Sequence, residues 1–422
     1  MLDVMGAEGR DGGPVAGVQK AGKRVLFMVS ASHASQHMYV ALLPLTYSYV
    51  LITFHINYAE LGLAVAATNG VGGLTQITAG YVSRRVAARW ILGSQNLILG
   101  LCAVLGSLAP TYPLFAGAQG IASLAASQQH PVGGAVLART YPDRRGTALS
   151  IHTIGGSVGS LLIPLPAAVL LSRFGWRPTM LILSAPLFLI GLLLVLTFPM
   201  PDVEHSRPRI PGRPRLWLPR LPRVPLAEMI QPRVVVFGIL AATVAAGGRG
   251  LGILSAYVPL YLRNGVHIPE VEVGLIVALM MLGAVVGPLI GGAMSDRWGR
   301  LPVLWVAYAL AAVFVFVLGR AAGLPLALIV LIALAVGVFA YIENPLLQAL
   351  VSDAVTGEGQ ASFFGIYFAI AYGVGSLWLG LLGWVIGAFG FTAAFSIMAA
   401  SYLAAGALLI PCWKTLHTNP AG

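Results

Sequence analysis

Six side chains that can carry a charge lie within long apolar stretches of this 422-residue chain, and their chemistry is the first guide to function. They comprise one carboxylic acid, one guanidinium group and four imidazoles: Glu343, Arg249, His33, His37, His130 and His152. A charged side chain at the centre of a bilayer costs roughly 2.5–3.5 kcal/mol on insertion scales. Ionisable residues in such stretches are therefore functional candidates by default.

Glu343 and Arg249 could act separately or as a pair. Glu343 precedes Asn344 and Pro345, and the proline frees a backbone carbonyl near the carboxyl group. A carboxyl group away from water holds its proton more readily, which suits a proton carrier near neutral pH. Arg249 lies in the glycine-rich stretch 247–252, and its planar fork fits a carboxylate, phosphate or phosphonate on a solute. The alternative for both residues is a static ion pair that holds two helices together.

The histidines indicate hydrogen bonding to a solute or a proton relay. His33 and His37 are four residues apart and therefore share one helix face. Because imidazole titrates near neutral pH, His37 is a second candidate for proton coupling beside Glu343. The spacing could also hold a metal ion, but no carboxylate or cysteine cluster accompanies it, so we predict no metal and no other cofactor. His152 is expected to pack or to cap near the cytoplasmic end of its helix. The predicted solute-binding set is His33, His37, Arg249, Gln36, Gln129, His130 and Tyr257.

Two glycine-rich strings are attributed to helix packing and not to chemistry. Residues 155–159 match GxSxG letter for letter, yet a nucleophile elbow needs a strand-to-helix turn with histidine and acidic partners. This string lies in an apolar helix, where small residues let helices approach closely. Gly283, Gly287 and Gly291 have the same interpretation. We therefore predict that the protein is not an enzyme.

Helices must position these side chains, because the chain is a series of apolar segments long enough to cross a bilayer. Hydrophobic residues make up 58% of the chain and charged residues 9%, against about 25% charged in soluble domains. We predict twelve spans in two sets of six, at 25–52, 59–82, 90–109, 113–138, 146–172 and 178–198, then at 233–262, 271–293, 301–320, 324–350, 361–388 and 391–411.

A connector rich in proline and arginine separates the two sets of spans. The expected division is an N-terminal arm at 1–24, a six-helix bundle at 25–198, the connector at 199–232, a second bundle at 233–411 and a tail at 412–422. Arginine and lysine concentrate in the arm, the connector and the loops on the same side, which places both termini in the cytoplasm. The net charge of +11 is therefore a topology signal with some attraction to lipid headgroups, and we predict no nucleic-acid partner.

The loop after the eighth span carries the pattern GxxxDRxGR. It consists of Gly292, Asp296, Arg297, Gly299 and Arg300. The pattern resembles the signature loop of the major facilitator superfamily. That resemblance implies an all-α membrane protein with the major facilitator fold, two pseudosymmetric six-helix bundles, and a cavity lined by helices 1, 4, 7 and 10. It also implies that the loop is a cytoplasmic gate, in which the carboxylate pairs with arginine or a helix N-terminus. The alternative is an ordinary surface ion-pair loop.

A narrower resemblance covers residues 30–180. The matching stretches are 32–44, 120–131 and 144–164. They are similar to the fosmidomycin-resistance branch of the superfamily, which implies proton-coupled export of a small organic solute or drug. The chain departs from that branch at Gln36 and His37, where the branch tends to have Asn-Asp. It also has Ala116 where many drug–proton antiporters have arginine.

The resemblance further implies a multi-pass monomer in a bacterial cytoplasmic membrane, with a small solute, protons and the lipid bilayer as its partners. The proton gradient would be the energy source. Proton-coupled uptake of a small organic anion or zwitterion stays an alternative, because the residues carry no signal for direction. A scaffold or receptor that does not transport is a more distant alternative, since such proteins usually carry a sizeable soluble domain.

Overall fold

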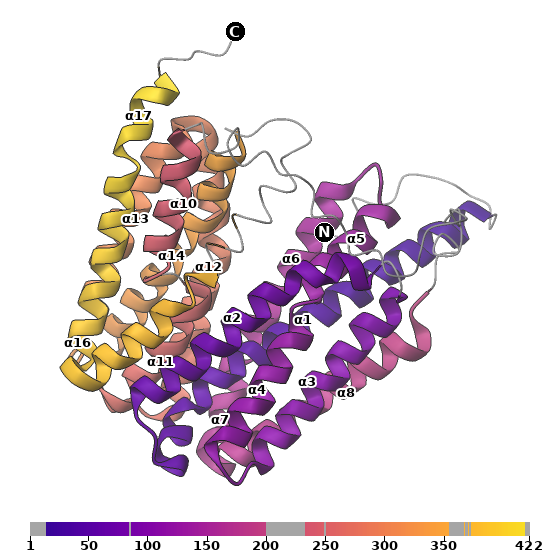
Figure 1. The fold of residues 1–422 in the computed structure, drawn as a ribbon, viewed down its shortest axis with the longest axis horizontal. Helices are drawn as coiled ribbons and strands as arrows, with labels where there is room; N and C mark the ends of the chain where they lie inside the picture. The colour runs from indigo at the N-terminus through magenta and orange to yellow at the C-terminus, as the bar shows by residue number, and fades with distance from the viewer. Residues whose placement is uncertain are drawn as a thin grey trace, which may run out of the picture.

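The chain is helical throughout the part that the computed structural model describes, and its helices form two bundles that lie side by side (Figure 1). The described residues are 14–83, 86–199, 233–248, 250–353, 367, 370 and 373–417. Within them, eight helices are long and apolar enough to cross a membrane, and Val234–Ala245 is a shorter apolar helix. The predicted all-α membrane architecture with two bundles is confirmed.

The first bundle breaks two of its six predicted spans into pairs of helices. Its elements are α1 (Pro14–Phe54), α2 (Tyr58–Val82), α3 (Ala88–Leu108), α4 (Tyr112–Ala126), α5 (Gln129–Thr140), α6 (Arg145–Leu162), α7 (Pro164–Phe174) and α8 (Trp176–Thr197). The fourth span is interrupted at Ser127 and Gln128, between α4 and α5. The fifth span is interrupted at Ile163, because Pro164 has no N–H to continue the helical hydrogen bonds.

The second bundle contains a broken seventh span. Its elements are α10 (Arg233–Ala245), the π-helix η3 (Gly250–Leu254), α11 (Ser255–Asn264), α12 (Glu270–Trp298), α13 (Arg300–Leu318), α14 (Leu326–Asp353), α16 (Leu377–Leu408) and α17 (Ile410–His417). Gly390 has φ +81° within α16, a conformation that glycine adopts readily, and it divides that element at the predicted boundary between spans eleven and twelve. The first residues of the span predicted at 361–388 lie outside the described part.

Glycines allow the close helix packing that holds each bundle together. A Cβ atom on Gly155 of α6 would lie 2.8 Å from the carbonyl oxygen of Ser30 in α1. A Cβ atom on Gly283 of α12 would lie 2.5 Å from the carbonyl oxygen of Leu334 in α14. Both distances are too short for a side chain, so the glycines bring the backbones together. The packing interpretation of both glycine strings is confirmed.

The two bundles contact each other where α2 packs against α16. A Cβ atom on Gly62 of α2 would lie 2.5 Å from the carbonyl oxygen of Leu379 and 3.2 Å from the Cα atom of Gly383, both in α16. Nearby, the Asn264 amide donates a hydrogen bond to the Tyr58 hydroxyl at 3.2 Å. We call this contact the α2–α16 seam.

The bundles also meet where α12 packs against α7. A Cβ atom on Gly274 of α12 would lie 2.8 Å from the carbonyl oxygen of Pro164 in α7. Figure 1 shows the bundles meeting around α7, α11 and the adjoining end of α2, and diverging toward α5 and α17. The molecule is therefore closed at one end and spread at the other.

Candidate proton and solute site

Four imidazoles from three helices of the first bundle form one cluster, which we call the imidazole cluster: His33 and His37 of α1, His130 of α5 and His152 of α6. The ring of His33 lies at the centre. Its centroid is 4.6 Å from that of His37, 4.7 Å from that of His130 and 4.2 Å from that of His152. His33 is buried, whereas His37 is half-buried and His130 is exposed. The cluster therefore has one accessible side.

Contacts from α6 determine how His33 is oriented. Its Nδ1 atom lies 2.8 Å from the carbonyl oxygen of His152, and a carbonyl oxygen can only accept a hydrogen bond. Nδ1 therefore carries the proton, and in the neutral ring Nε2 keeps its lone pair. A Cβ atom on Gly156 would lie 2.6 Å from Cε1 of His33, so the missing side chain at Gly156 makes room for the ring.

A buried polar network supports the cluster from behind. The Gln129 side-chain oxygen accepts hydrogen bonds from Ser32 at 2.8 Å and from Gln95 at 2.9 Å. Asn96 donates to the Ser32 hydroxyl at 2.8 Å and accepts from Ser35. All five side chains are buried. Because the network joins α1, α3 and α5, it holds the helices that carry three of the four imidazoles in a fixed arrangement.

The remaining predicted residues of α1 lie beside the cluster. His37 Nδ1 lies 3.0 Å from the Ser160 hydroxyl in α6. Gln36 donates a hydrogen bond to the Ala126 carbonyl oxygen at 3.2 Å, at the break between α4 and α5. The structure thus gathers His33, His37, Gln36, Gln129 and His130, all predicted as solute-binding residues, into one region.

Sequence reasoning missed the contribution of His152 to the cluster. It was expected to pack near a helix end, and it is indeed buried, but its ring stacks on His33 with an interplanar angle of 24°. A signal was present in the spacing. His152 and Gly156 are four residues apart and therefore share a face of α6, the face that packs on α1. The polar network of Ser32, Gln95 and Asn96 gave no comparable signal.

Glu343 of α14 is fully buried in the second bundle, at 0% exposure. Arg249 lies outside the described residues, so a Glu343–Arg249 ion pair stays a prediction. The helix break that follows Ala245 is stabilised by α16, since Tyr402 donates a hydrogen bond to the Gly248 carbonyl oxygen and Trp378 donates to the Thr243 carbonyl oxygen at 3.0 Å. π-Helical turns such as η3 occur frequently at functional sites.

Tyr257 of α11 is buried at the α2–α16 seam. Its hydroxyl donates a hydrogen bond to the Leu379 carbonyl oxygen, and a Cβ atom on Gly62 would lie 2.7 Å from the same hydroxyl. In this conformation Tyr257 is therefore part of the contact between bundles. Its predicted role in solute binding stays a prediction.

The loop predicted as a gate joins α12 to α13. Gly299 has φ +84°, which only glycine adopts without strain, and it lets the chain turn between the two helices. Arg300 forms a two-pronged ion pair with Asp353 at the end of α14, at 2.6 and 3.2 Å. Asp296 and Arg297 are exposed, and neither makes an ion pair within the described part of the chain. A Cβ atom on Gly292, the first residue of the pattern, would have no other atom within 4 Å.

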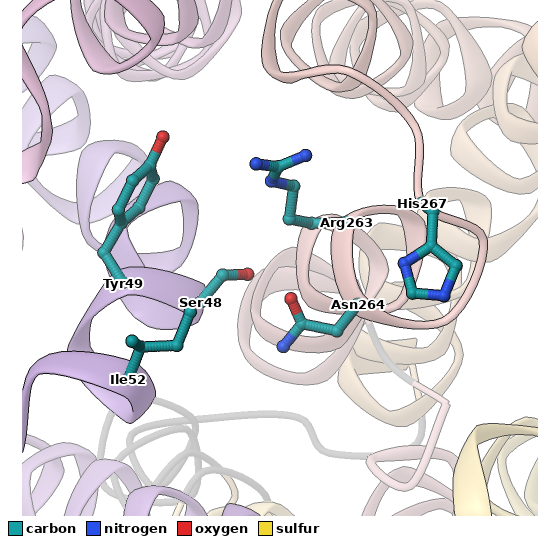
Figure 2. Close-up of a pocket in the computed structure, with 6 residues that line it drawn as sticks. All are labelled: Ser48, Tyr49, Ile52, Arg263, Asn264 and His267. Carbon is teal, nitrogen blue, oxygen red and sulfur yellow. The ribbon is translucent and has the colours of Figure 1, made fainter. Parts of the chain in front are cut away.

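A pocket of about 380 Å³ lies where α1 faces α11, near the closed end of the molecule (Figure 2). Its lining residues are Ser48, Tyr49, Ile52, Arg263, Asn264 and His267. The only guanidinium group in the lining belongs to Arg263, which forms an ion pair with Glu270 at 2.7 Å. Because that charge is already neutralised, we assign the pocket to the contact between bundles and not to solute binding.

The fold and these intramembrane polar groups define a transporter that moves small molecules across a membrane. The family model described as "Major Facilitator Superfamily" matches residues 25–269 and 239–421, so the chain belongs to this superfamily. Its members are transporters and not enzymes, as predicted.

Individual relatives are more distant. The chain is 25% identical to the fosmidomycin resistance protein of Escherichia coli K12, over 85% of both chains. It is 29% identical to the class C tetracycline resistance protein of Escherichia coli, over 42% of this chain and 43% of that protein. Among solved structures, a mutant of the nucleoside transporter NupG superposes with a TM-score of 0.76 at 16% identity, covering 92% of this chain and 99% of that one. The last comparison bears on the fold alone.

Proposed function

We propose that this protein exports a small organic solute in exchange for protons, by alternating access of a central site. The observation that carries the proposal is the distribution of ionisable groups over the two bundles. A fully buried acid, Glu343, lies in α14, and an imidazole cluster with one accessible side lies in α1, α5 and α6. When bundles rock against each other, groups on facing sides are exposed to one compartment and then to the other.

The proposed cycle uses Glu343 as the proton carrier and the imidazole cluster with Arg249 as the solute contact. Arg249 and hydrogen-bonding imidazoles fit a carboxylate, phosphate or phosphonate, so the solute is anionic or zwitterionic. The ionised Glu343 carboxylate would attract the cationic group of a zwitterionic solute, and protonation of Glu343 removes that attraction. Proton binding therefore favours release of such a solute, as exchange requires.

Export is favoured by the relatives, because two of them are named for resistance to a drug, fosmidomycin in one case and tetracycline in the other. The conformation is consistent with export. The bundles diverge toward α5 and α17, the end that the positive-inside rule assigns to the cytoplasm. A solute would enter the imidazole cluster from that side of a bacterial cytoplasmic membrane.

The first test is growth of a transporter-depleted bacterium, with and without this chain, on a panel of toxic small molecules that includes phosphonates. We expect the chain to raise the inhibitory concentration of at least one anionic or zwitterionic compound. Glu343→Gln, which cannot ionise, should return it to the value of the empty vector. The matched control is Glu272→Gln, because Glu272 is only half-buried, in the first turn of α12.

The other possible results of the growth test would each contradict one part of the proposal. Resistance that survives Glu343→Gln would show that another group carries the proton. Increased sensitivity to a compound would indicate uptake and overturn export. No change for any compound would contradict drug export. In inside-out vesicles, addition of the active compound should dissipate a preformed pH gradient for wild type and not for Glu343→Gln.

A further inference from the structure

We propose that His33, His37 and His130 form a binding site for a divalent transition-metal ion of the zinc class. The three residues each present one ring nitrogen, and these nitrogens all lie within 4.8 Å of one another. Residues four apart on α1 supply two of the ligands and α5 supplies the third. The third ligand comes from a residue almost a hundred positions away in the sequence, which is why the His33–His37 spacing alone was not a metal signature.

The tautomer of His33 prepares this residue to act as a ligand. Its Nδ1 proton is donated to the His152 carbonyl oxygen at 2.8 Å. Its Nε2 atom is buried and has no hydrogen-bond partner. A buried nitrogen with a free lone pair is costly, because it has lost water without gaining a donor. Metal coordination would satisfy it, and a second hydrogen bond from the other ring nitrogen to a carbonyl is the usual support for a ligating histidine.

The distances require only a small adjustment. Zinc–nitrogen bonds of about 2.0–2.1 Å in a tetrahedral site place donor atoms about 3.4 Å apart, so the rings must approach one another by at most about 1.4 Å. His130 is exposed and His37 is half-buried, so both side chains have room to rotate toward the fixed ring of His33. His37 also has its Nδ1 atom 3.0 Å from the Ser160 hydroxyl, which leaves Nε2 for the ion.

The donor set determines which ions fit. Three neutral imidazoles suit borderline ions such as Zn²⁺, Co²⁺ and Ni²⁺, whereas Mg²⁺ and Ca²⁺ prefer oxygen ligands. Three protein ligands leave a fourth coordination position open, on the side where His130 is exposed. An anionic group can occupy that position, so a bound ion would add a point of attachment for a solute or would block the site against one.

The test uses the full-length protein, purified in detergent through an affinity tag that contains no histidine. Co²⁺ titration should produce the visible absorption bands of a tetrahedral site, and Zn²⁺ titration by calorimetry should give one ion per chain. His37→Asn and His130→Asn should each raise the dissociation constant for the ion by about tenfold or more. Even mutation of a residue that only hydrogen-bonds to a metal ligand lowers metal affinity by about that factor. Thermal unfolding without metal shows whether each variant is folded.

The matched control is His55→Asn. His55 is exposed and lies outside the cluster, and its φ of 51° is a conformation that asparagine tolerates. The control should bind Co²⁺ and Zn²⁺ as wild type does. The proposal is wrong if the wild-type protein binds no stoichiometric ion, or if both cluster variants bind as tightly as the control. The titrations contain no solute and no proton gradient, so their outcome is independent of the export proposal.

Discussion

At the scale of single residues, Gly156 decides where the central imidazole lies. The ring of His33 rests against the backbone of α6, with its Nδ1 hydrogen bond to His152 on one side and the rings of His37 and His130 at its edges. A methyl group at position 156 would lie 2.6 Å from Cε1 and 2.9 Å from Nδ1 and Nε2 of that ring. All three distances are shorter than real Cβ contacts, so the ring must leave its position.

Gly156→Ala should therefore destabilise the protein, in spite of the better helix propensity of alanine. Overpacking of this kind costs about 1–3 kcal/mol. We expect a lower apparent melting temperature by tryptophan fluorescence and reduced solute export. The control is Gly134→Ala in α5, where the added methyl group would meet only Leu149, at an ordinary 3.7 Å. Equal melting temperatures for the two variants would contradict the proposed tight contact.

At the scale of helices, the α2–α16 seam limits how the bundles move. Gly62 and Gly383 let two backbones approach closely, and the aromatic rings of Tyr58 and Phe391 pack edge to face with centroids 5.4 Å apart at the same end. A contact made by backbones does not adapt by changing rotamers. The seam therefore has a closed state with full contact, and it opens when the helices separate.

Gly62→Ala should shift the protein toward the state in which this end is open. Its methyl group would lie 2.5 Å from the Leu379 carbonyl oxygen, which cannot move aside without moving α16. Spin labels on Thr111→Cys and Ala322→Cys, exposed positions in loops of opposite bundles, should then report a longer distance. Gly73→Ala in the same helix is the control, because open space surrounds that position. An unchanged distance distribution in Gly62→Ala would contradict the closed-seam interpretation.

At the scale of the whole molecule, the orientation in the membrane follows from charge and the conformation follows from where the bundles touch. The loop between α5 and α6 is rich in arginine, with Arg139, Arg144 and Arg145 near it, and it lies at the end where the bundles diverge. By the positive-inside rule we expect that end to face the cytoplasm. The seam end, with the loop before α4, would then face outward.

This orientation predicts the reactivity of two exposed loop positions. Thr111→Cys should react with a membrane-impermeant maleimide in intact cells, and Asp143→Cys should react only after the cells are opened. The background protein would have Cys102 and Cys412, both buried, replaced by serine. Labelling of Asp143→Cys in intact cells would invert the proposed topology.

Much of the architecture was predictable because the relevant signals are local. The length of each apolar segment is compared with the thickness of a bilayer, and neither quantity depends on the rest of the fold. The glycine strings at 155–159 and 283–292 predicted close packing for the same reason, since a missing side chain permits approach whatever the partner helix. The loop at 292–300 resembles the signature loop of the superfamily and so predicted family membership. The match to the family model confirms that prediction.

The candidate site was predictable in its residue types and not in its arrangement. Polar residues in an apolar segment stand out by composition, so His33, His37, Gln36, Gln129 and His130 were identified without a structure. Their proximity, however, depends on the break at Ser127 and Gln128, where α5 begins. The ion pair of Arg300 with Asp353 could not be predicted from the sequence either. Asp353 lies at the end of another helix, and its position depends on how α14 packs in the bundle and not on the loop.

The sequence alone determined that this protein has two sets of membrane spans, because hydropathy, span length and loop charge act segment by segment, and the resemblance of its loop at 292–300 to the superfamily signature indicated a transporter. Only the tertiary structure decided that imidazoles from α1, α5 and α6 share one cluster, that His152 orients His33, and that the bundles close at the α2–α16 seam. Those features are contacts between residues far apart in the chain. Their geometry depends on how whole helices pack, and local spacing, such as that of His152 and Gly156, shows only which residues share a helix face.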